Sequence, residues 1–554
     1  MKTVLTFQPR RLAQAVVMAS MMSPTLVLAA LPAAAPDAGR LTRELQQPVM
    51  PSSPSAPIVL PAQSQERVAP GGLRIRINSV LFSGNTVFSQ AELAAVVAPA
   101  MGKAYDLAGI YALADQVSEF YRSKGFVFAS VFVPENGLED GKLLLQVVEG
   151  RFGQISARDV ERNTRREKAA QRYLSPLKSG EVIEQSKLER QMLLLGDLPG
   201  VAVTPVMKPG KTVGTGDLEA TIERTPRIHG QVNLSNHGNR YTGYHQARAI
   251  ANIDSPFLFG DQLSASLMSS DERLKSGSLN YSLPLGANGL RANVGYSYTD
   301  YRLGREFANL AASGRSQITN IGLSYPLIRS RNSNISVSTQ AQHKRFFDEQ
   351  KTTATTQSRG SDSGTLRLNF DHLDRTGIIY GQVAYTLGRF SSGDPLDLAK
   401  TNGNFSYVSA DLVRLQRLRE RLSVFARVSG QKALNNLDSS ESFTLGGPFA
   451  VRAYPTGEGT GDEGAFSQVE LRYQTTANVV PFVFFDAGSV RLERDRTALG
   501  KNGRTLSGAG VGVRSQYKAW SLESTIARRL VGGEPQSDIR DGQYTGWLSV
   551  GYAF

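Results

Sequence analysis

The sequence of 554 residues contains no cysteine. This absence excludes disulfide frameworks and thiolate metal sites, and it is compatible with an envelope protein. The chain also has no internal run of about 20 apolar residues, so no membrane-spanning helix is expected. Its mean hydropathy of −0.24 still permits a membrane β-barrel, because lipid-facing and lumen-facing residues alternate along the strands of such a barrel.

Motifs for catalysis and nucleotide binding are missing as well. The stretch 459–464 fits the G-x-G-x-x-G spacing, but no helix follows it and its acidic residues would repel phosphate. Lys211 and Thr212 resemble the end of a P-loop, but Pro205 stands where the first glycine belongs. The five histidines lack the H-E-x-x-H spacing, and no G-x-S-x-G elbow is present. We expect no enzyme, no metal site and no cofactor.

Basic residues are in excess, but they do not form a nucleic-acid footprint. Lys and Arg number 62 against 49 Asp and Glu, a formal charge of +13. They are spread along strand-like segments rather than clustered on one helix, so no nucleic-acid partner is expected. Abundant residues are glycine (53), phenylalanine (24) and tyrosine (19), which suit tight turns, strands and the aromatic girdles of barrels.

The N-terminus has the pattern of an export signal. Residues 1–35 combine a basic start, an apolar stretch from Leu12 to Leu28, and small-residue cleavage sites near Ala29 or Ala35. Pro24 and polar residues within the apolar stretch disfavour an uncleaved membrane anchor. The sequence therefore predicts a signal peptide and an exported protein.

A short helix and a tether are expected next. Residues 36–47 form a candidate amphipathic helix, with Leu41 and Leu45 one turn apart. Residues 48–72 are rich in Pro, Ser, Gln and Ala and predict an extended linker. A helix on such a linker can occupy a site far from its neighbours in the sequence. A frayed N-terminus of the mature protein explains the same residues equally well.

Two modules of similar predicted structure follow, at residues 73–150 and 151–226. Each has the order β-α-α-β-β, so the pair forms an internal repeat. A module of this size is too small for an enzyme with its own pocket. Such a module offers an open sheet edge and a groove between helix and strand. These are the parts needed to capture an extended peptide by β-augmentation.

From residue 227 to 554 the helical periodicity stops and alternating strand-length segments take over. Roughly 330 residues at about 20 per strand and joint predict about 16 antiparallel strands, an even number suited to closure. One face of these segments is apolar, and the other carries many Arg, Asn, Gln and Ser residues. This pattern favours a membrane barrel with a wet lumen over a soluble sandwich, and closure removes exposed edges.

A long loop at 433–463 holds an arginine, and the second strand-like segment after it holds an aspartate; each charge would be costly to bury without a partner. The motif residues are Val451, Arg452, Ala453 and Tyr454 in the loop, and Phe484, Asp486 and Gly488 in the strand. If Phe485 faces lipid, Asp486 points into the lumen, where a bidentate arginine is its best partner. Periodicity alone leaves a solvated arginine and a hydrated aspartate as an equal alternative.

Taken together, these motifs resemble a known family. The chain is similar to the two-partner secretion transporters in five features. These are two β-α-α-β-β modules, a 16-stranded barrel, a tethered helix, V-R-x-Y in a long loop and F-x-D-x-G in a later strand. These transporters are the haemolysin-activator (ShlB/FhaC/HecB) branch of the POTRA-domain barrel superfamily. The resemblance covers residues 36–554. Ala453 departs from the glycine usual in the family loop, so a left-handed backbone there is disfavoured and an altered loop tip is expected.

The resemblance implies a function and the roles of several residues. It implies an outer-membrane transporter with POTRA domains in the periplasm, which threads a large unfolded exoprotein to the surface. The partner would be a haemolysin, an adhesin or a contact-dependent toxin. By the same resemblance, Leu41 and Leu45 belong to a plug helix, Arg452 and Asp486 form a latch, and Tyr552 and Phe554 form the signal for the barrel-assembly machinery. The alternatives are an outer-membrane protein insertase, which would need more POTRA modules, and a porin, which would need none.

Overall fold

The computed structural model describes residues 35–45, 70–271, 273–393, 397–497, 499–538 and 542–554. The predicted signal peptide and most of the predicted linker lie outside these residues. Within them, no helix combines the length and apolar content needed to cross a membrane. The domain boundaries predicted from the sequence remain predictions.

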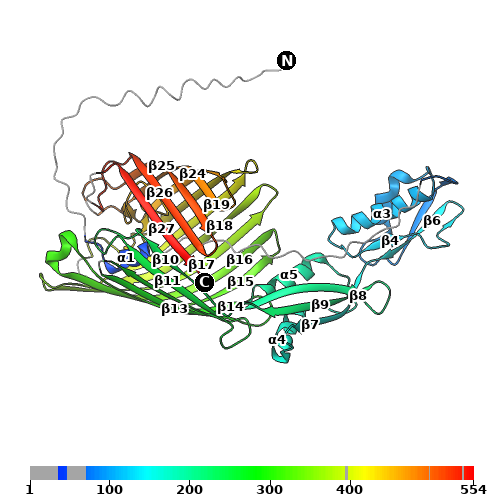
Figure 1. Cartoon of the computed structure of the whole chain (residues 1–554), viewed down its shortest axis with the longest axis horizontal. Helices are drawn as coiled ribbons and strands as arrows, with labels where there is room; N and C mark the ends of the chain where they lie inside the picture. The colour runs from blue at the N-terminus through cyan, green and yellow to red at the C-terminus, as the bar shows by residue number, and fades with distance from the viewer. Residues whose placement is uncertain (1–34, 46–69, 272, 394–396, 498, 539–541) are drawn as a thin grey trace, which may run out of the picture. The chain divides into compact units, whose positions relative to one another are not determined.

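The first module has one helical layer on a small mixed sheet (Figure 1). Its elements are β1 (Ile75–Arg76), β2 (Ser79–Ser83), α2 (Gln90–Val97), β3 (Ala104–Tyr105), α3 (Leu107–Ser123), β4 (Ser130–Phe132), β5 (Leu138–Glu139) and β6 (Lys142–Val148). The sheet order is β2-β6-β4, with β2 parallel and β4 antiparallel to β6. A capping box between Ser89 and Glu92 begins α2, and α3 ends before Gly125, whose φ of +94° only glycine adopts readily.

The second module repeats this topology. Its elements are β7 (Arg151–Asp159), α4 (Thr164–Leu174), α5 (Gln185–Gly196), β8 (Val201–Pro209) and β9 (Thr215–Arg224). The sheet order is β7-β9-β8, again with the first strand parallel and the second antiparallel to a central third strand. Each module buries its own apolar core between helices and sheet.

Sixteen of the remaining strands form one closed antiparallel barrel, which confirms the predicted fold class. The first half is β10 (Ile228–Ser235), β11 (Gln246–Asp254), β12 (Gln262–Ser270), β13 (Leu274–Pro284), β14 (Arg291–Arg302), β15 (Ala312–Arg329), β16 (Ser333–Gln350) and β17 (Thr355–Leu373). The second half is β18 (Gly377–Ser391), β19 (Gly403–Arg417), β20 (Leu422–Ala433), β23 (Glu463–Tyr473), β24 (Val479–Arg491), β25 (Arg504–Tyr517), β26 (Trp520–Val531) and β27 (Tyr544–Ala553).

The barrel closes where its last strand pairs with its first. β27 lies beside β10 (Figure 1), and the last residue completes the ladder. Phe554 and Gly230 exchange both backbone hydrogen bonds, at 2.9 and 3.0 Å. A Cβ on Gly230 would lie 2.7 Å from the Phe554 ring, so glycine allows this close contact. Closure gives every barrel strand a neighbour on both sides.

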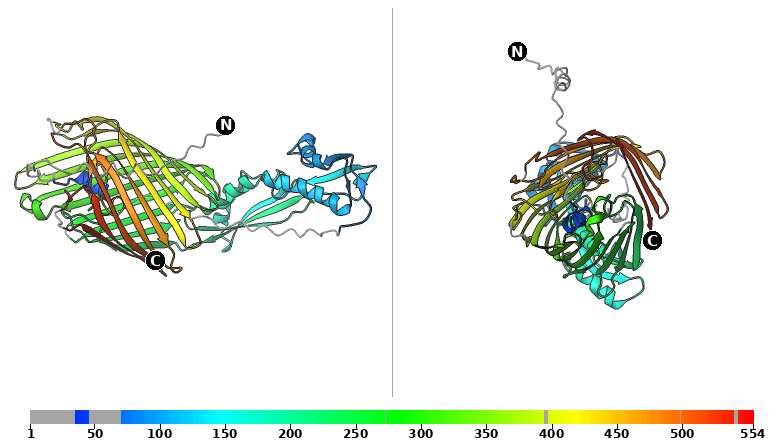
Figure 2. Two further views of the ribbon diagram at one scale, coloured as in Figure 1. Left: turned by 90° about the horizontal axis from the view of Figure 1, so that it is seen from above. Right: turned by 90° about the vertical axis from the view of Figure 1, so that its left-hand side faces the viewer.

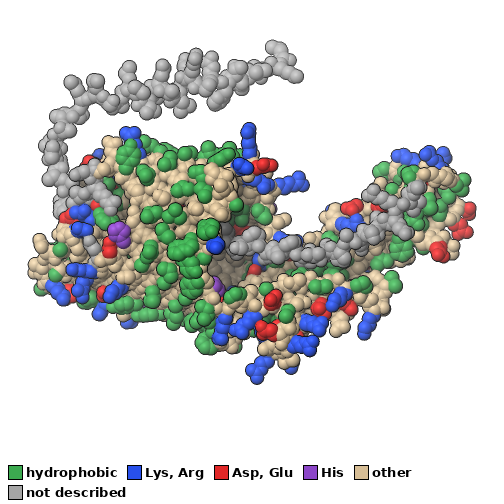
Figure 3. All heavy atoms as spheres, viewed as in Figure 1, with side chains coloured by type: hydrophobic (Ala, Val, Ile, Leu, Met, Phe, Trp, Pro, Cys, Tyr) green, Lys and Arg blue, Asp and Glu red, His purple; other side chains and the backbone are tan. Residues whose placement is uncertain are grey.

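The wall has the two faces that the alternation predicted. On β24, Phe485 is exposed on the outer surface while Asp486 is fully buried inside. Apolar side chains are spread over the visible outer wall of the barrel (Figure 3). Helix α1 (Ala38–Glu44) lies inside the ring of strands (Figure 2), where it contacts β14, β15 and β16. The chain therefore places its N-terminal helix within its own lumen.

Candidate functional site in the barrel lumen

The long loop folds back into the barrel rather than extending away from it. It connects β20 to β23, and its short strands β21 (Phe443–Thr444) and β22 (Thr460–Gly461) pair with each other. Its tip, from Val451 to Tyr454, is buried, with no residue more than 3% exposed. Phe443 and Leu445 pack with Phe466 and Phe484 of the wall. The loop is therefore packed against the inner wall.

Arg452 makes a bidentate ion pair with Asp486. Its Nε and Nη2 donate to the two carboxylate oxygens at 2.8 and 2.7 Å, and its backbone N–H donates to Oδ2 at 3.1 Å. The guanidinium also lies 3.6 Å from the centroid of the Phe484 ring, a cation–π contact. The Arg452 side chain is 3% exposed and that of Asp486 is 0% exposed. Two buried charges that are this well paired compensate each other, and either would be costly alone.

Glu470 is a further partner of Arg452 that the sequence reasoning missed. It lies on β23, accepts from Arg452 Nη1, and also pairs with Arg472 and Arg514 at 2.7 and 2.8 Å. Alternation along β23 puts Glu470 on the buried, lumen-facing side of the strand. Only the register that sets Glu470 opposite Phe484 reveals that it reaches the arginine. The wall therefore offers two carboxylates to one loop arginine.

The glycine of the strand motif has a packing role. A Cβ on Gly488 would lie 2.5 Å from Leu445 of the loop and 2.6 Å from the Ala465 carbonyl oxygen. Such distances are far below van der Waals contact, so only glycine lets the loop approach this closely. Phe484, Asp486 and Gly488 thus each face the loop from one side of β24.

The carbonyl groups of the loop tip are bonded to the last two strands. Trp547 Nε1 donates to the Arg452 carbonyl at 2.8 Å, and Thr545 donates to the Ala453 carbonyl at 2.8 Å. The Tyr454 hydroxyl donates to the Val531 carbonyl at 2.8 Å. Ala453 is not in the left-handed backbone region, so the expected difficulty of an alanine at this position does not arise.

Helix α1 is capped by Asp37, whose side chain accepts from the Arg40 backbone N–H at 2.9 Å. Leu41 is buried at 2% exposure, whereas Leu45 ends the helix and is half-buried. The Leu45 carbonyl accepts from Arg248 Nη2 of β11 at 3.2 Å. Thr42 Oγ1 lies 2.8 Å from Ser316 Oγ of β15. The predicted plug residues therefore lie in the lumen, against the wall.

One wall arginine joins the helix, the wall and the loop. Arg359 of β17 pairs with Asp37 at 3.2 Å, with Asp348 of β16 at 2.8 Å and with Asp438 of the loop at 2.7 Å. Ser439 of the loop donates to Asp37 at 2.7 Å. Since three carboxylates share this single guanidinium, its loss would leave three neighbouring negative charges without their shared cation.

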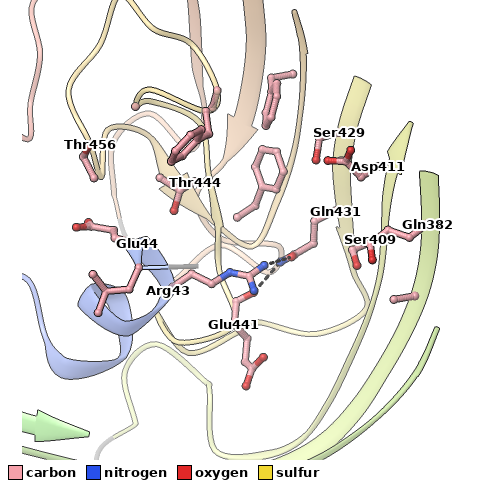
Figure 4. A pocket seen from close by; sticks show the side chains of 18 of the residues that line it. Arg43, Glu44, Gln382, Ser409, Asp411, Ser429, Gln431, Glu441, Thr444 and Thr456 are labelled. Atoms are coloured by element: carbon pink, nitrogen blue, oxygen red, sulfur yellow. Dashed lines mark hydrogen bonds between the residues drawn. The ribbon is translucent and has the colours of Figure 1, made fainter. Parts of the chain in front are cut away.

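The helix contacts the loop along its length as well. Arg40 Nη2 donates to the Gly457 carbonyl at 2.5 Å, and Arg43 Nε donates to the Ser442 carbonyl at 3.2 Å. Figure 4 shows Arg43 reaching across the cavity toward Gln431 of β20. The helix and the loop are therefore bonded to each other as well as to the wall, so movement of either breaks bonds of the other.

The cavity beside the helix has a volume of about 580 Å³ and a polar lining. It is bordered by the helix, the loop and strands from both halves of the barrel (Figure 4). Arg248, Gln340, Arg367, Gln382 and Ser409 are among its lining residues. Among the described residues, no group of three or more His, Cys, Asp or Glu side chains could hold a metal ion.

The C-terminal motif residues face outward, away from this site. The Tyr552 ring packs against the Trp520 ring in a tilted arrangement, with centroids 4.9 Å apart, and the side chains of Tyr552 and Phe554 are exposed on the outer surface. They contribute nothing to the lumen. Their aromatic rings lie where an apolar bilayer edge would meet the barrel.

Fold and lumen together define an outer-membrane transporter of the POTRA-domain barrel class. The chain belongs to the haemolysin secretion/activation protein family ShlB/FhaC/HecB, whose model matches residues 214–515. The model of the ShlB-type POTRA domain matches residues 75–150. The protein is thus a two-partner secretion transporter of the outer membrane, and its POTRA domains lie in the periplasm.

Curated relatives and solved structures agree with this membership. The heme/hemopexin transporter protein HuxB of Haemophilus influenzae is 26% identical over 542 residues, which span 93% of this chain and 94% of that protein. The outer membrane transporter CdiB of Dickeya dadantii is 24% identical over 81% of this chain and 82% of its own length. The structure of CdiB from Escherichia coli has a TM-score of 0.71 at 22% identity, covering 90% of this chain and 94% of that one.

The alternative of an insertase is not favoured. BamA from Haemophilus ducreyi without its POTRA domains 1–3 shares the fold with a TM-score of 0.53 at 13% identity. At this identity the likeness concerns the fold alone. The matching family and the named relatives are transporters, and none of them belongs to a known class of enzyme.

Proposed function

We propose that the chain moves one large unfolded exoprotein through its lumen, with helix α1 and the long loop as the parts that must rearrange. The observation that carries the proposal is the seating of α1, which occupies the lumen and contacts three wall strands. A cargo chain cannot share this space with the helix. Translocation therefore requires α1 to leave or move aside.

Capture of the cargo is assigned to the first POTRA module. The outer edge of β2 is occupied, because Gln90 of α2 bonds both the N–H and the carbonyl of Phe82. Gln171 of α4 likewise bonds Ala157 N–H and the Ile155 carbonyl of β7. We assign capture to the β4 edge, at which Phe132 is exposed; its Val131 N–H already donates to Ser118 Oγ of α3 at 2.9 Å, so the cargo would pair with other backbone groups of this edge.

The second module adds a groove for an extended segment. A cavity of about 560 Å³ lies between β7 and α4, and it is lined by Gln154, Ile155, Leu174 and Leu177. Its mixed polar and apolar lining suits an unfolded chain, which presents both backbone and apolar side chains. Haemolysin, adhesin and toxin exoproteins remain the proposed cargo classes, and Tyr552 with Phe554 the proposed signal for barrel assembly.

Reversible locking tests the role of α1, since the natural chain has no cysteine. Thr42→Cys with Ser316→Cys replaces two side chains whose oxygens are 2.8 Å apart, and a disulfide there would fix α1 to β15. We expect secretion to stop under oxidation and to return on reduction. Normal secretion by the oxidised variant would remove α1 from the transport mechanism.

A matched cysteine pair controls for oxidation itself. Thr365 and Thr386 lie on β17 and β18 with their hydroxyl oxygens 2.9 Å apart, and both line the lumen cavity. Thr365→Cys with Thr386→Cys would link two wall strands that are already paired. We expect secretion by this variant to be the same under oxidising and reducing conditions.

Deletion of residues 73–150 distinguishes a transporter from a passive pore. In a transporter, this deletion should stop secretion, while ion conductance through the barrel remains.

A further inference from the structure

A basic cavity lies on the outer rim of the barrel, separate from the lumen site. Its volume is about 380 Å³, and it is formed by the ends of β14, β15 and β16 and the short helix η2 (Arg305–Leu310). The basic lining residues are Arg273, Arg302, Arg315 and Lys351, and the acidic ones are Asp300 and Glu349. We propose that this cavity binds the phosphate groups of the glycolipid that forms the outer leaflet, lipopolysaccharide.

The strand register brings the basic residues together. Arg315 of β15 is opposite Asp300 of β14, and Arg302 lies two residues further on the same face of β14. Such diagonal neighbours have Cα atoms roughly 7–8 Å apart, a spacing that lets two guanidinium groups share one phosphate. The Arg302 backbone N–H donates to the Arg273 carbonyl at 3.2 Å. Arg315 is held over the Phe347 ring at 4.8 Å.

These four bases have no carboxylate partner. No carboxylate of the described residues lies within ion-pair distance of Arg273, Arg302, Arg315 or Lys351, and all four are exposed. The other side of the rim is different. There Lys432 of β20 and Arg491 of β24 both pair with Glu463, at 2.9 and 3.8 Å. Glu463 also pairs with Arg494 at 3.0 Å, so the bases on that side share a carboxylate at ion-pair distance, whereas the four cavity bases have none within that distance among the described residues.

The strand direction places the cavity on the cell-surface side. β10 follows the periplasmic POTRA modules, and successive barrel strands alternate in direction. β14 is the fifth barrel strand and runs parallel to β10, so its last residue, Arg302, lies at the far end from the periplasm. The outer leaflet, where lipopolysaccharide resides, is the leaflet at that end.

The cavity also lies at the depth of lipid head groups. On the same outer face of β14, Val294, Tyr296 and Tyr298 are exposed and continue the apolar band. Aromatic residues mark the bilayer interface in membrane barrels. Arg302 follows Tyr298 by four residues, a distance of about 13 Å along the strand. Because the strands of a membrane barrel are tilted, Arg302 lies about 10 Å beyond Tyr298 along the membrane normal. Figure 3 shows Lys and Arg side chains gathered toward the end of the barrel, beyond its hydrophobic band.

The chemistry of these groups selects a phosphate. Arginine binds phosphate through bidentate, charge-assisted hydrogen bonds. A lipid whose acyl chains lie against the apolar band is held at two places at once, which raises the effective concentration of its phosphates at the cavity. The bisphosphorylated lipid A part of lipopolysaccharide meets both requirements.

The test compares lipid A with its dephosphorylated form, using the full-length protein purified in detergent and native mass spectrometry to count retained lipids. We expect the natural chain to retain lipid A at least about fivefold better than dephosphorylated lipid A, because the phosphates add two or three charge-assisted hydrogen bonds. The triple variant Arg302→Ser, Arg315→Ser, Lys351→Ser should retain the two lipids equally. The control variant Lys432→Ser, Arg491→Ser should keep the preference, because these two bases lie outside the cavity and pair with Glu463.

Three results would overturn the proposal: equal retention of both lipids by the natural chain, an unchanged preference in the triple variant, or complete displacement by excess inorganic phosphate. Secretion is measured in parallel, because an acidic segment of the cargo is the rival occupant. We expect the triple variant to secrete normally. Lost secretion with an intact lipid preference would assign the surface to the cargo and overturn lipid binding. Heat-dependent gel migration confirms that each variant is folded.

Discussion

The side chain of Ala453 occupies the space that a side chain on Gly508 would need. An ideal Cβ on Gly508 of β25 would lie 2.2 Å from the Ala453 Cβ and 2.9 Å from the Arg528 carbonyl oxygen. The loop tip therefore accommodates an alanine because the facing wall residue is a glycine. Gly508→Ala should displace the tip and lower secretion, measured as exoprotein in the culture medium, without preventing barrel assembly.

Coupling between these two residues distinguishes this contact from a general defect of β25. In the double variant Gly508→Ala with Ala453→Gly, the methyl–methyl overlap is gone, while the contact with the Arg528 carbonyl remains. We expect secretion to recover in part. A double variant no better than Gly508→Ala would show that the loop tip does not sense Gly508.

Arg452→Ala should unlatch the loop. Asp486 would then be buried without its cation, whereas Glu470 would keep Arg472 and Arg514. Removal of one partner of a buried ion pair costs about 3–5 kcal/mol, so the loop should leave the wall while the barrel still assembles. Secretion should fall, and limited proteolysis should cut the loop. Arg452→Ala with Asp486→Asn should restore part of the protease resistance, because the uncompensated charge is gone.

Arg359→Gln should unseat helix α1. The variant leaves Asp37, Asp348 and Asp438 without their shared cation, and the loss of a buried charge partner costs about 3 kcal/mol or more. We expect the open fraction of single channels in planar bilayers to rise by at least about tenfold. Arg367→Gln is the matched control on the same lumen face of β17, since Arg367 makes no ion pair with the described residues. Equal conductance of both variants would contradict the role of Arg359.

Glu149 should make the first POTRA module sensitive to acid. Burial raises the pKa of Glu149, but hydrogen bonds from the Thr86 hydroxyl, the Val87 and Thr86 backbone N–H groups and the Tyr121 hydroxyl outweigh it and hold the pKa below its usual value. A lowered carboxyl pKa stabilises the fold above the unfolded-state pKa, and this stabilisation is lost as pH falls through the folded-state pKa.

The substitution Glu149→Gln measures this contribution. We expect it to destabilise the module at neutral pH by about 1–3 kcal/mol, since an amide nitrogen would face hydrogen-bond donors. Hydrogen exchange of the α3 amides in the full chain reports the change. The difference between variant and natural chain should shrink as pH falls through the folded-state pKa of Glu149, which lies below the usual glutamate value. A difference that is constant with pH would exclude the carboxylate charge as its cause.

Gln171 should protect the edge of β7. Gln171→Leu removes both side-chain bonds to β7, so the Ala157 amide should exchange faster by about 2- to 12-fold, which corresponds to a net 0.5–1.5 kcal/mol. Gln171→Glu keeps an acceptor for this N–H and should preserve its protection. Unchanged exchange in the leucine variant would show that the glutamine does not occupy the edge, and would weaken the assignment of capture to β4.

Much of the fold follows from local patterns in the sequence. Alternation distinguishes the apolar outer face from the polar lumen face, as the exposed Phe485 and the buried Asp486 show. Helix signals such as the Ser89–Glu92 capping box and Gly125 depend on neighbouring residues only. These features were predictable because period 2, capping and turn geometry are properties of short segments.

The amino-acid sequence by itself therefore determined the barrel, the repeated modules and the candidate pair Arg452 and Asp486. Only the tertiary structure decided that Glu470 also reaches Arg452, that Arg359 joins three carboxylates, and that Gly508 makes room for Ala453. Each of these contacts joins strands or loops far apart in the chain. Their geometry depends on strand register and on the path of the long loop, which no local periodicity encodes.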